Sequence, residues 1–343
     1  MEYKLYTGAY TGGQPGEGVA SWGFDGKSLR EVWRYGGLRN PSYVLPWGKR
    51  LYGVEELPKG AGLACLSWEQ TGAPQMLWHR QVQGAGLCHL TLEGKVLYAS
   101  GYDGGTLTGV EKDEGETCFF QAFQGHGPNP ARQEKAHIHS TQVSPDGTRL
   151  LAADLGTDRL YQFLLGEGGK LIPDPEQPWI QTGPGQGPRH FAFHPNGKWL
   201  YLVTELDRSL LVYHYEDHRL EEMGAYSLRM PGDPEASLAA DIHLTEDGAF
   251  LYASVRGPDC LYGFRVEEGG AVLQPLGRFP TLGGCPRNFS LSPDGKWIAV
   301  ANQEPGTLVI FSRDETTGLP GEALCQAKVS QVSCVKWGPN IEN

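Results

Sequence analysis

The chain has 343 residues, with 48 glycines, 24 prolines and only 20% charged residues, a composition that favours many short strands joined by tight turns over long helices. Forty acidic residues against 29 basic ones give a formal net charge of -11. A protein of this charge repels polyanions, so we expect no nucleic-acid partner.

The first residues and the cysteines predict a compartment. Residues 1–6 lack a basic region followed by an apolar one, and no apolar run is long enough to cross a bilayer. Seven cysteines occur without a Cys-x-x-Cys pair, and their odd number fits a reducing compartment better than a disulfide framework. We therefore expect a cytoplasmic protein without membrane association, whose cysteines are small core residues.

A hairpin motif, two apolar strands around a glycine-containing turn, recurs along the chain. Its turn glycines lie at positions 48, 94, 147, 197, 248 and 295, at spacings of 46, 53, 50, 51 and 47 residues. In four copies the dipeptide is Asp-Gly or Asn-Gly, which supplies the positive φ of a tight hairpin turn. A third strand and a looser fourth one follow each hairpin. This period of about fifty residues predicts the blades of a β-propeller.

The seventh copy is split between the two ends of the chain. Residues 332–337 supply its first strand and residues 3–7 its second. Pairing the termini closes the ring and leaves no unpaired strand edge, whereas an open β-solenoid would need capping repeats that the sequence lacks. We predict an all-β fold, one domain over 1–343: a seven-bladed β-propeller of four-stranded antiparallel blades. Segments 124–132 and 183–187, rich in glycine and proline, are expected to connect blades.

Two columns of residues are expected to meet on one face of such a ring, at the starts of the first strands and the ends of the second strands. Counting back eight and seven residues from the turn glycines gives Asn40 and Pro41, Gly86 and Leu87, His139 and Ser140, Arg189 and His190, Ala240 and Asp241, and Arg287 and Asn288. The second column is Tyr10, Glu56, Tyr102, Leu155, Glu205, Arg256 and Gln303. Both columns are polar and differ from blade to blade, so we predict that they hold the functional site.

The charges in these columns indicate the kind of ligand. Arg189, Arg256 and Arg287 are expected to form a positive region at the channel mouth, and guanidinium groups bind carboxylate or phosphate in a bidentate manner. A small anion is therefore the expected ligand, with Glu205 and His139 as candidates for proton transfer. The alternative for each residue is an ordinary structural salt bridge.

Two histidines two residues apart allow a different interpretation. His137 and His139 project to one side of a strand and would suit zinc, but no third ligand has suitable spacing, so we expect no metal. His137 is instead placed with the substrate-binding residues, or it is buried behind a pocket histidine.

Several segments of the chain resemble the seven-bladed lactonase family, whose best known activity is 6-phosphogluconolactonase. These segments are 40–43, 154–159, 187–197, 286–289 and 301–303. The resemblance covers nearly the whole chain and implies hydrolysis of a sugar lactone without a cofactor, with 6-phosphoglucono-δ-lactone giving 6-phosphogluconate in the pentose phosphate pathway. His243 stands where the family often has an arginine.

The resemblance also implies residue roles. In the carboxy-muconate lactonizing relatives, His, Arg and Glu at the channel mouth bind a carboxylate and move a proton, and the matching residues are His139, Arg189, Glu205 and Arg256. We predict Glu205, His139 and Arg189 as catalytic residues. The predicted substrate-binding residues are Arg256, Arg287, Asn288, His190, Gln303 and His137.

The expected mechanism follows from these roles. Arg287, Arg256 and His190 hold the anionic end of the substrate, and either Glu205 or His139 activates water. An arginine or the Asn288 amide stabilises the oxyanion. Two other functions stay open, a muconate-type cycloisomerase that uses the same pocket and a non-enzymatic propeller that binds a protein or peptide. The sequence does not fix whether the substrate is phosphorylated or whether the ring self-associates.

Overall fold

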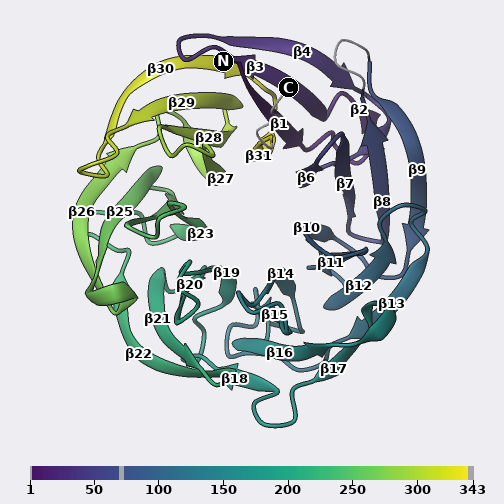
Figure 1. Ribbon diagram of the computed structural model, residues 1–343, viewed down its shortest axis with the longest axis vertical. Helices are drawn as coiled ribbons and strands as arrows, with labels where there is room; N and C mark the ends of the chain where they lie inside the picture. The colour runs from purple at the N-terminus through teal and green to yellow at the C-terminus, as the bar shows by residue number, and fades with distance from the viewer. Residues whose placement is uncertain (1, 69–72, 339–343) are drawn as a thin grey trace.

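The computed structural model describes residues 2–68 and 73–338, which form seven antiparallel sheets arranged as the blades of a ring (Figure 1). Within these ranges the only helical elements are two 3-10 turns, η1 (Glu167–Gly169) and η2 (Glu268–Gly270). None of the described helices is long and apolar enough to cross a membrane. The predicted seven-bladed β-propeller is confirmed.

Each blade runs from an inner strand beside the ring axis to an outer strand at the rim (Figure 1). A separate two-stranded ladder joins β2 (Pro15–Gly16) to β5 (Leu38–Arg39). The strands of the blades, from the inside outwards, are β31 (Val332–Trp337), β1 (Tyr3–Ala9), β3 (Val19–Phe24) and β4 (Leu29–Tyr35); β6 (Val44–Trp47), β7 (Arg50–Leu57), β8 (Gly60–Ser67) and β9 (Gln75–Val82); β10 (Leu87–Glu93), β11 (Val96–Gly101), β12 (Thr106–Glu111) and β13 (Thr117–Ala122); β14 (Ile138–Val143), β15 (Arg149–Asp154), β16 (Arg159–Leu165) and β17 (Leu171–Pro173) with β18 (Trp179–Gln181); β19 (Pro188–Phe193), β20 (Trp199–Thr204), β21 (Ser209–Glu216) and β22 (Arg219–Ser227); β23 (Leu238–Leu244), β24 (Phe250–Arg256), β25 (Cys260–Glu267) and β26 (Val272–Pro280); and β27 (Gly284–Leu291), β28 (Trp297–Glu304), β29 (Thr307–Arg313) and β30 (Pro320–Lys328).

The ends of the chain close the ring within one blade. Strand β31 pairs antiparallel with β1, with Trp337 opposite Leu5 and Val335 opposite Thr7. Each end therefore satisfies the backbone groups of the other, and the ring has no open edge. The split seventh copy is confirmed, with its first strand at the predicted bounds.

One blade departs from the predicted four strands. Strands β17 and β18 both pair with β16, one beyond the other along its edge. Pro175 and Pro178 lie between them and have no N–H to donate to a ladder. Asp174 closes this interruption by accepting hydrogen bonds from the backbone N–H groups of Glu176 and Gln177. The outer position of this blade is therefore filled by two short strands.

The hairpin turns depend on glycine more than the dipeptides suggest. All six turn glycines have positive φ, between 56° and 74°, whereas the preceding Asp and Asn residues do not. In the turn at 144–147, the Gly147 N–H donates to the Ser144 carbonyl (2.8 Å) and the Ser144 hydroxyl donates to the Asp146 carboxylate (2.6 Å). The acidic residue therefore braces the turn by hydrogen bonding, and glycine alone adopts the left-handed conformation.

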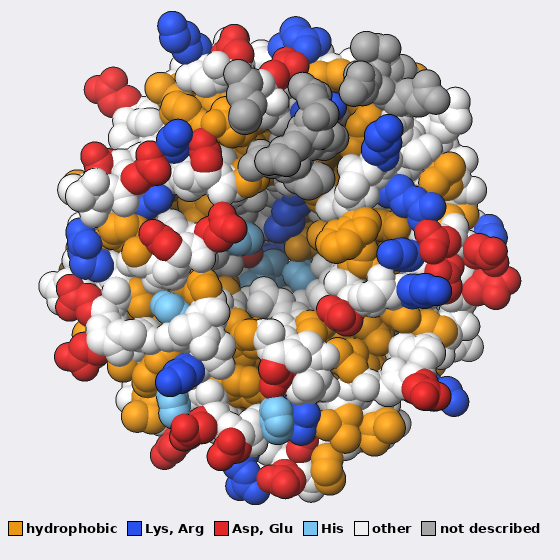
Figure 2. All heavy atoms as spheres, viewed as in Figure 1, with side chains coloured by type: hydrophobic (Ala, Val, Ile, Leu, Met, Phe, Trp, Pro, Cys, Tyr) orange, Lys and Arg blue, Asp and Glu red, His pale blue; other side chains and the backbone are white. Residues whose placement is uncertain are grey.

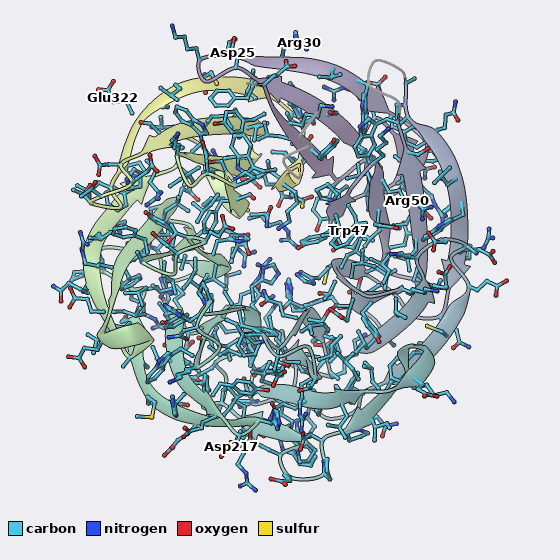
Figure 3. All side chains as sticks on the ribbon, viewed as in Figure 1. Asp25, Arg30, Trp47, Arg50, Asp217 and Glu322 are labelled. Atoms are coloured by element: carbon cyan, nitrogen blue, oxygen red, sulfur yellow. The ribbon has the colours of Figure 1, made fainter. Side chains whose placement is uncertain are left out.

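Neighbouring blades are joined by a repeated tyrosine contact. The hydroxyls of Tyr98, Tyr201 and Tyr252 each donate to a glycine carbonyl of the next blade, those of Gly169, Gly270 and Gly318. Two of these hydrogen bonds are buried and the third is partly buried, and all three tyrosine rings pack in the core. Charged residues such as Asp25, Arg30 and Glu322 lie at the outer rim instead (Figure 3). The blades thus form a rigid frame for residues near the axis.

The cysteines follow the expectation only in part. All seven are unpaired; four are buried, and Cys118, Cys285 and Cys325 are partly exposed. Cys88 is buried but lines a cavity beside the channel, so it is not simply a core residue.

Candidate active site

Most inner strands have a β-bulge near their starts, and in three of them the bulge presents a candidate site residue. The ladder register shifts at His139 in β14, at Arg189 in β19 and at Arg287 in β27. A bulge inserts one extra residue and turns its side chain out of the regular alternation. The repeat therefore presents a side chain of variable chemistry at the same height in successive blades.

Glu205 is the centre of the cluster. It directly follows β20, and its backbone is fixed because its N–H donates to the Gly187 carbonyl and its carbonyl accepts from the Ala239 N–H. The Oε2 atom of Glu205 lies 2.7 Å from Arg189 Nε and 3.0 Å from Arg256 Nη2. Arg132 donates to the other oxygen, Oε1. One buried carboxylate is therefore surrounded by three guanidinium groups.

The surrounding charges set the protonation states of this cluster. Burial alone would raise the pKa of Glu205, but Arg256, Arg189 and Arg132 together hold it well below its ordinary value. Burial and the neighbouring Arg256 lower the pKa of Arg189 to about 10, so it stays charged at neutral pH. Glu205 is accordingly a permanent anion whose oxygens are already hydrogen-bonded, and such a carboxylate is a weak base.

His139 stands beside this carboxylate in its neutral form. Its Nε2 atom lies 3.9 Å from Glu205 Oε2, and its side chain is almost fully buried. Burial, Arg189 and His190 hold its pKa well below the ordinary value. The nearby thiol of Cys88 is also uncharged, because burial raises its pKa. The ring is therefore a neutral imidazole, which can accept a proton, although its lowered pKa makes it a weaker base than an ordinary histidine.

Arg287 and Glu56 line one cavity together with His139 and Arg189. Arg287 lies over the Tyr10 ring, 5.6 Å from its centroid, and has no salt bridge to any residue that the structure describes. Glu56 accepts hydrogen bonds from the hydroxyls of Tyr10 and Ser42. Burial raises the pKa of Glu56, and Arg287 offsets this only in part. The surroundings therefore raise the pKa of Glu56 and lower the pKa of Glu205.

Asn288 and His190 are held by Asp241. The Asn288 amide donates to Asp241 Oδ2, and its oxygen accepts from the Val335 N–H at 2.8 Å. His190 Nδ1 lies 2.6 Å from Asp241 Oδ1. These contacts leave Asn288 engaged on both sides, so its expected role at the oxyanion stays a prediction. His190 has its second nitrogen, Nε2, without a partner in the described structure.

The structure brings together most of the predicted site, but not His137 and Gln303. His137 stacks on Tyr102, and both of its ring nitrogens are engaged, with the Tyr102 carbonyl and with Glu134. Gln303 donates to the side chain of Gln331, which directly precedes β31, in an exposed contact. Neither residue lines the cavity with His139, Arg189 and Arg287. Their substrate-binding roles stay predictions.

Comparisons with known proteins agree with this architecture. A family model described as lactonase, 7-bladed beta-propeller, matches residues 4–337. The chain belongs to this lactonase family. A 6-phosphogluconolactonase of Formosa agariphila is 33% identical over 92% of this chain and 93% of its own length, and one of Bacillus subtilis is 31% identical over 98% of both chains. The solved structure of a periplasmic gluconolactonase from Pseudomonas aeruginosa has a TM-score of 0.91 at 27% identity, covering 98% of this chain and 99% of its own.

The sequence did not identify every residue at the centre of this lactonase-family propeller. Arg132 lies on the connection between β13 and β14, outside the two columns of positions counted along the repeat, yet it contacts Glu205. Glu56 stands in the second polar column, but its raised pKa depends on burial that the column does not reveal. Among the described residues, no group of three or more His, Cys, Asp or Glu side chains is arranged to hold a metal ion.

Proposed function

We propose that this protein hydrolyses a sugar lactone that carries an anionic substituent, with 6-phosphogluconolactone as the first candidate. The observation that carries the proposal is Arg287. Arg132, Arg189 and Arg256 each contact Glu205, whereas Arg287 lines the cavity without a salt bridge to any carboxylate in the described structure. An unpaired guanidinium near a neutral imidazole suits the phosphate of such a substrate. The names of the two curated relatives support the same substrate.

In the proposed reaction, His139 is the base. A water molecule attacks the lactone carbonyl carbon while His139 takes one of its protons, and the imidazolium that forms is stabilised by the Glu205 carboxylate 3.9 Å away. The three arginines keep Glu205 ionised and fixed in place, so it is available as a counter-charge throughout. This assignment selects between the two bases that the sequence leaves open.

The tetrahedral intermediate then needs stabilisation and a proton. Arg189, which lines the same cavity, faces the oxyanion, and a contact of this kind is typically worth about 3 kcal/mol in the transition state. The bond between the carbonyl carbon and the ring oxygen breaks, and the departing oxygen takes a proton from Glu56, which lines the same cavity and whose pKa is raised by burial. The imidazolium of His139 returns its proton to Glu56 through solvent. The products are a hydroxyl group and a carboxylic acid, and the acid releases its proton to solvent to become the carboxylate.

The experiment is a stopped-flow assay of 6-phosphogluconolactone and plain gluconolactone, each measured against its spontaneous hydrolysis. We expect the protein to accelerate the phosphorylated lactone more strongly than the plain one. The variant His139→Gln removes the base and should lower kcat by about a hundredfold or more. An exposed histidine, His126, gives the matched control His126→Gln, which should retain the full rate. Rates equal to the spontaneous ones in the wild-type protein would refute the proposal.

The names of the relatives support hydrolysis over the cycloisomerase and scaffold alternatives. Activity on 6-phosphogluconolactone would assign the protein to the pentose phosphate pathway. The cytoplasmic location expected from the sequence stays a prediction, and one structural relative is periplasmic.

A further inference from the structure

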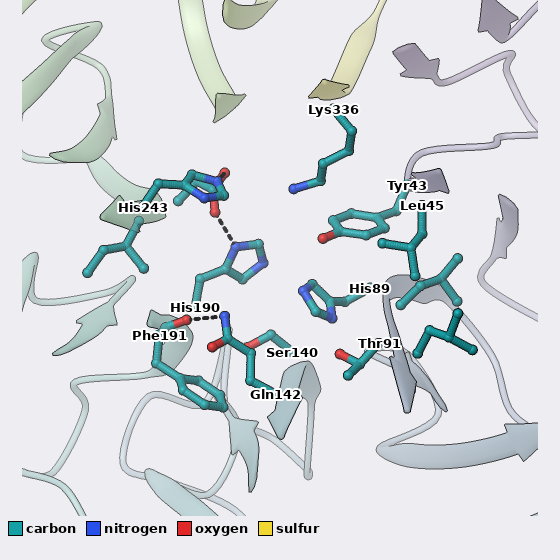
Figure 4. A pocket seen from close by; sticks show the side chains of 14 residues that line it. Tyr43, Leu45, His89, Thr91, Ser140, Gln142, His190, Phe191, His243 and Lys336 are labelled. Atoms are coloured by element: carbon teal, nitrogen blue, oxygen red, sulfur yellow. Dashed lines mark hydrogen bonds and ion pairs between the residues drawn. The ribbon is translucent and has the colours of Figure 1, made fainter. Parts of the chain in front are cut away.

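A second cavity lies further along the channel, on the face of the ring where the inner strands end. Its volume is about 250 Å³, and its walls include His89, His190, Tyr43 and Lys336 (Figure 4). The face seen in Figure 2 is hollowed at its centre, with histidine and basic side chains deep inside. Tyr43 and His190 line both this cavity and the one that contains Arg287. They therefore separate two compartments of one channel.

Lys336 supplies a positive charge to this cavity. Its ammonium nitrogen lies 4.9 Å from the centroid of the Tyr43 ring and has no salt bridge to any residue in the described ranges. Burial would lower its pKa, but Tyr43 and other neighbours, including Asp241, hold the pKa above its ordinary value. The ammonium group thus stays charged without a carboxylate to neutralise it. Lys336 is partly exposed, so an anionic ligand that enters the cavity can pair with this charge.

His190 supplies a hydrogen-bond acceptor. Because Asp241 is a carboxylate and only accepts, the proton of the neutral ring lies on Nδ1, which donates to Asp241. The second nitrogen, Nε2, then presents a lone pair, and it has no partner although only 7% of the residue is exposed. Burial and Arg189 lower the pKa of His190 to about 4, so the ring is neutral at physiological pH.

Asp241 also lines this cavity, but its oxygens are already hydrogen-bonded to protein groups. Its Oδ1 atom accepts from His190, and its Oδ2 atom accepts from His243 at 2.9 Å, from the Asn288 amide and from the Phe289 N–H at 3.2 Å. A carboxylate with this many donors has little capacity left for a ligand. Asp241 orients His190 through this hydrogen bond, whereas Lys336 has no salt bridge among the described residues and can contact a ligand.

His89 and Gln142 complete the hydrogen-bonding pattern. The Nδ1 atom of His89 accepts from the Thr141 N–H at 3.4 Å, so the ring proton lies on Nε2, which can donate. Gln142 uses its amide N–H on the Phe191 carbonyl, which leaves its oxygen as an acceptor. The cavity therefore offers one cation and one neutral donor together with two acceptors.

We propose that this second cavity binds a small hydroxy-carboxylate, whose carboxylate group contacts Lys336 and His89 and whose hydroxyl group donates to His190 Nε2. A plain carboxylate would leave the buried His190 nitrogen unpaired, and a neutral polyol would leave Lys336 unpaired. The first omission costs affinity because a buried polar atom without a partner is destabilising, and the second loses a charge-assisted hydrogen bond. The site lies apart from the Arg287 compartment, and the proposal does not depend on lactone hydrolysis.

The test is isothermal titration calorimetry of the full chain with three probes: glycerate, propionate and glycerol. We expect glycerate to bind saturably, propionate several-fold more weakly and glycerol not at all. The variant Lys336→Met keeps the length of the side chain and should weaken glycerate by at least about tenfold, since a charge-assisted hydrogen bond is lost. The exposed Lys328 gives the matched control Lys328→Met, which should bind glycerate like the wild type. His89→Gln is a second variant if Lys336→Met fails to fold.

Titrating Arg287→Gln separates the two compartments. Unchanged glycerate binding in this variant supports the second site, whereas its loss would assign the ligand to the arginine compartment and overturn the proposal. Equal affinity of the wild-type protein and Lys336→Met would also overturn it, as would the absence of saturable glycerate binding. Propionate that binds as tightly as glycerate would remove the role of His190. A negative lactonase assay changes none of these outcomes.

Discussion

Arg189 and Glu205 form an ion pair that is almost entirely buried, with 2.7 Å between Nε and Oε2 and side chains only 2% and 3% exposed. Removing one charge from such a pair leaves the other uncompensated, and this typically costs about 3 to 5 kcal/mol of unfolding free energy. We expect Glu205→Gln to be destabilised by this amount, because three arginines then lose their shared anion. Urea unfolding monitored by tryptophan fluorescence measures it.

The control for this change is Arg132→Gln. Arg132 contacts the same carboxylate but is 33% exposed, so water replaces part of the lost contact. Its stability loss should be clearly smaller than that of Glu205→Gln. Equal losses in the two variants would contradict the central position of Glu205 in the cluster.

Arg287→Gln should act on substrate binding rather than on stability. Arg287 has no salt bridge among the described residues, and the buried Glu56 keeps its hydrogen bonds from Tyr10 and Ser42 when Arg287 is removed. Loss of a charge-assisted contact to phosphate raises KM for 6-phosphogluconolactone by about tenfold to a hundredfold. The KM for plain gluconolactone should change little, because that substrate has no phosphate. Steady-state kinetics with both lactones provide the measurement, and an equal rise for both would contradict a phosphate contact.

The spacing of the turn glycines predicted six blades, because each hairpin turn requires a residue with positive φ, and the strand-like segments at the two ends predicted the closing blade. Gly147 and Gly197 mark equivalent turns, and counting back from them located His139 and Arg189 correctly at the channel. The same count cannot reach Lys336, because the blade that contains it is closed by the two termini and has no turn glycine. The sequence also does not predict the bulges of the inner strands. A bulge is a shift in the pairing between two strands, so it becomes visible only when the partner strand is known.

The raised pKa of Glu56 predicts a distinct pH dependence. A protonated acid becomes unavailable as the pH rises through its pKa, so the proposed donation to the ring oxygen fails on the alkaline side. In Glu56→Gln the side chain has no acidic proton at any pH. We expect a lower kcat with a flatter alkaline limb, measured after subtraction of spontaneous hydrolysis.

The control for this profile is Glu55→Gln. Glu55 is the adjacent residue, but it pairs with Arg39 and His79 outside the cavity. Its variant should keep the wild-type shape of the pH profile, whatever its stability. An unchanged alkaline limb in Glu56→Gln would rule out Glu56 as the acid.

The buried histidines predict that the folded protein loses stability as the pH falls. The pKa of His190 is lowered from 6.5 to about 4, so between these values the unfolded chain binds a proton that the folded one does not. Stability is then fully present above pH 6.5 and decreases towards pH 4, by up to about 1.4 kcal/mol per pH unit for this group. Burial also lowers the pKa of His89 and His139, so their contributions have the same sign.

Urea unfolding at pH 7 and pH 5 tests this dependence, with His190→Gln as the variant. Glutamine does not titrate in this range, so the difference in unfolding free energy between the two pH values should be smaller in His190→Gln than in the wild type. The comparison uses that difference and not the absolute stability, because glutamine also loses the contact with Asp241. His126→Gln removes an exposed histidine and should retain the wild-type difference. The same difference in His190→Gln would mean that His190 is not held neutral by its surroundings.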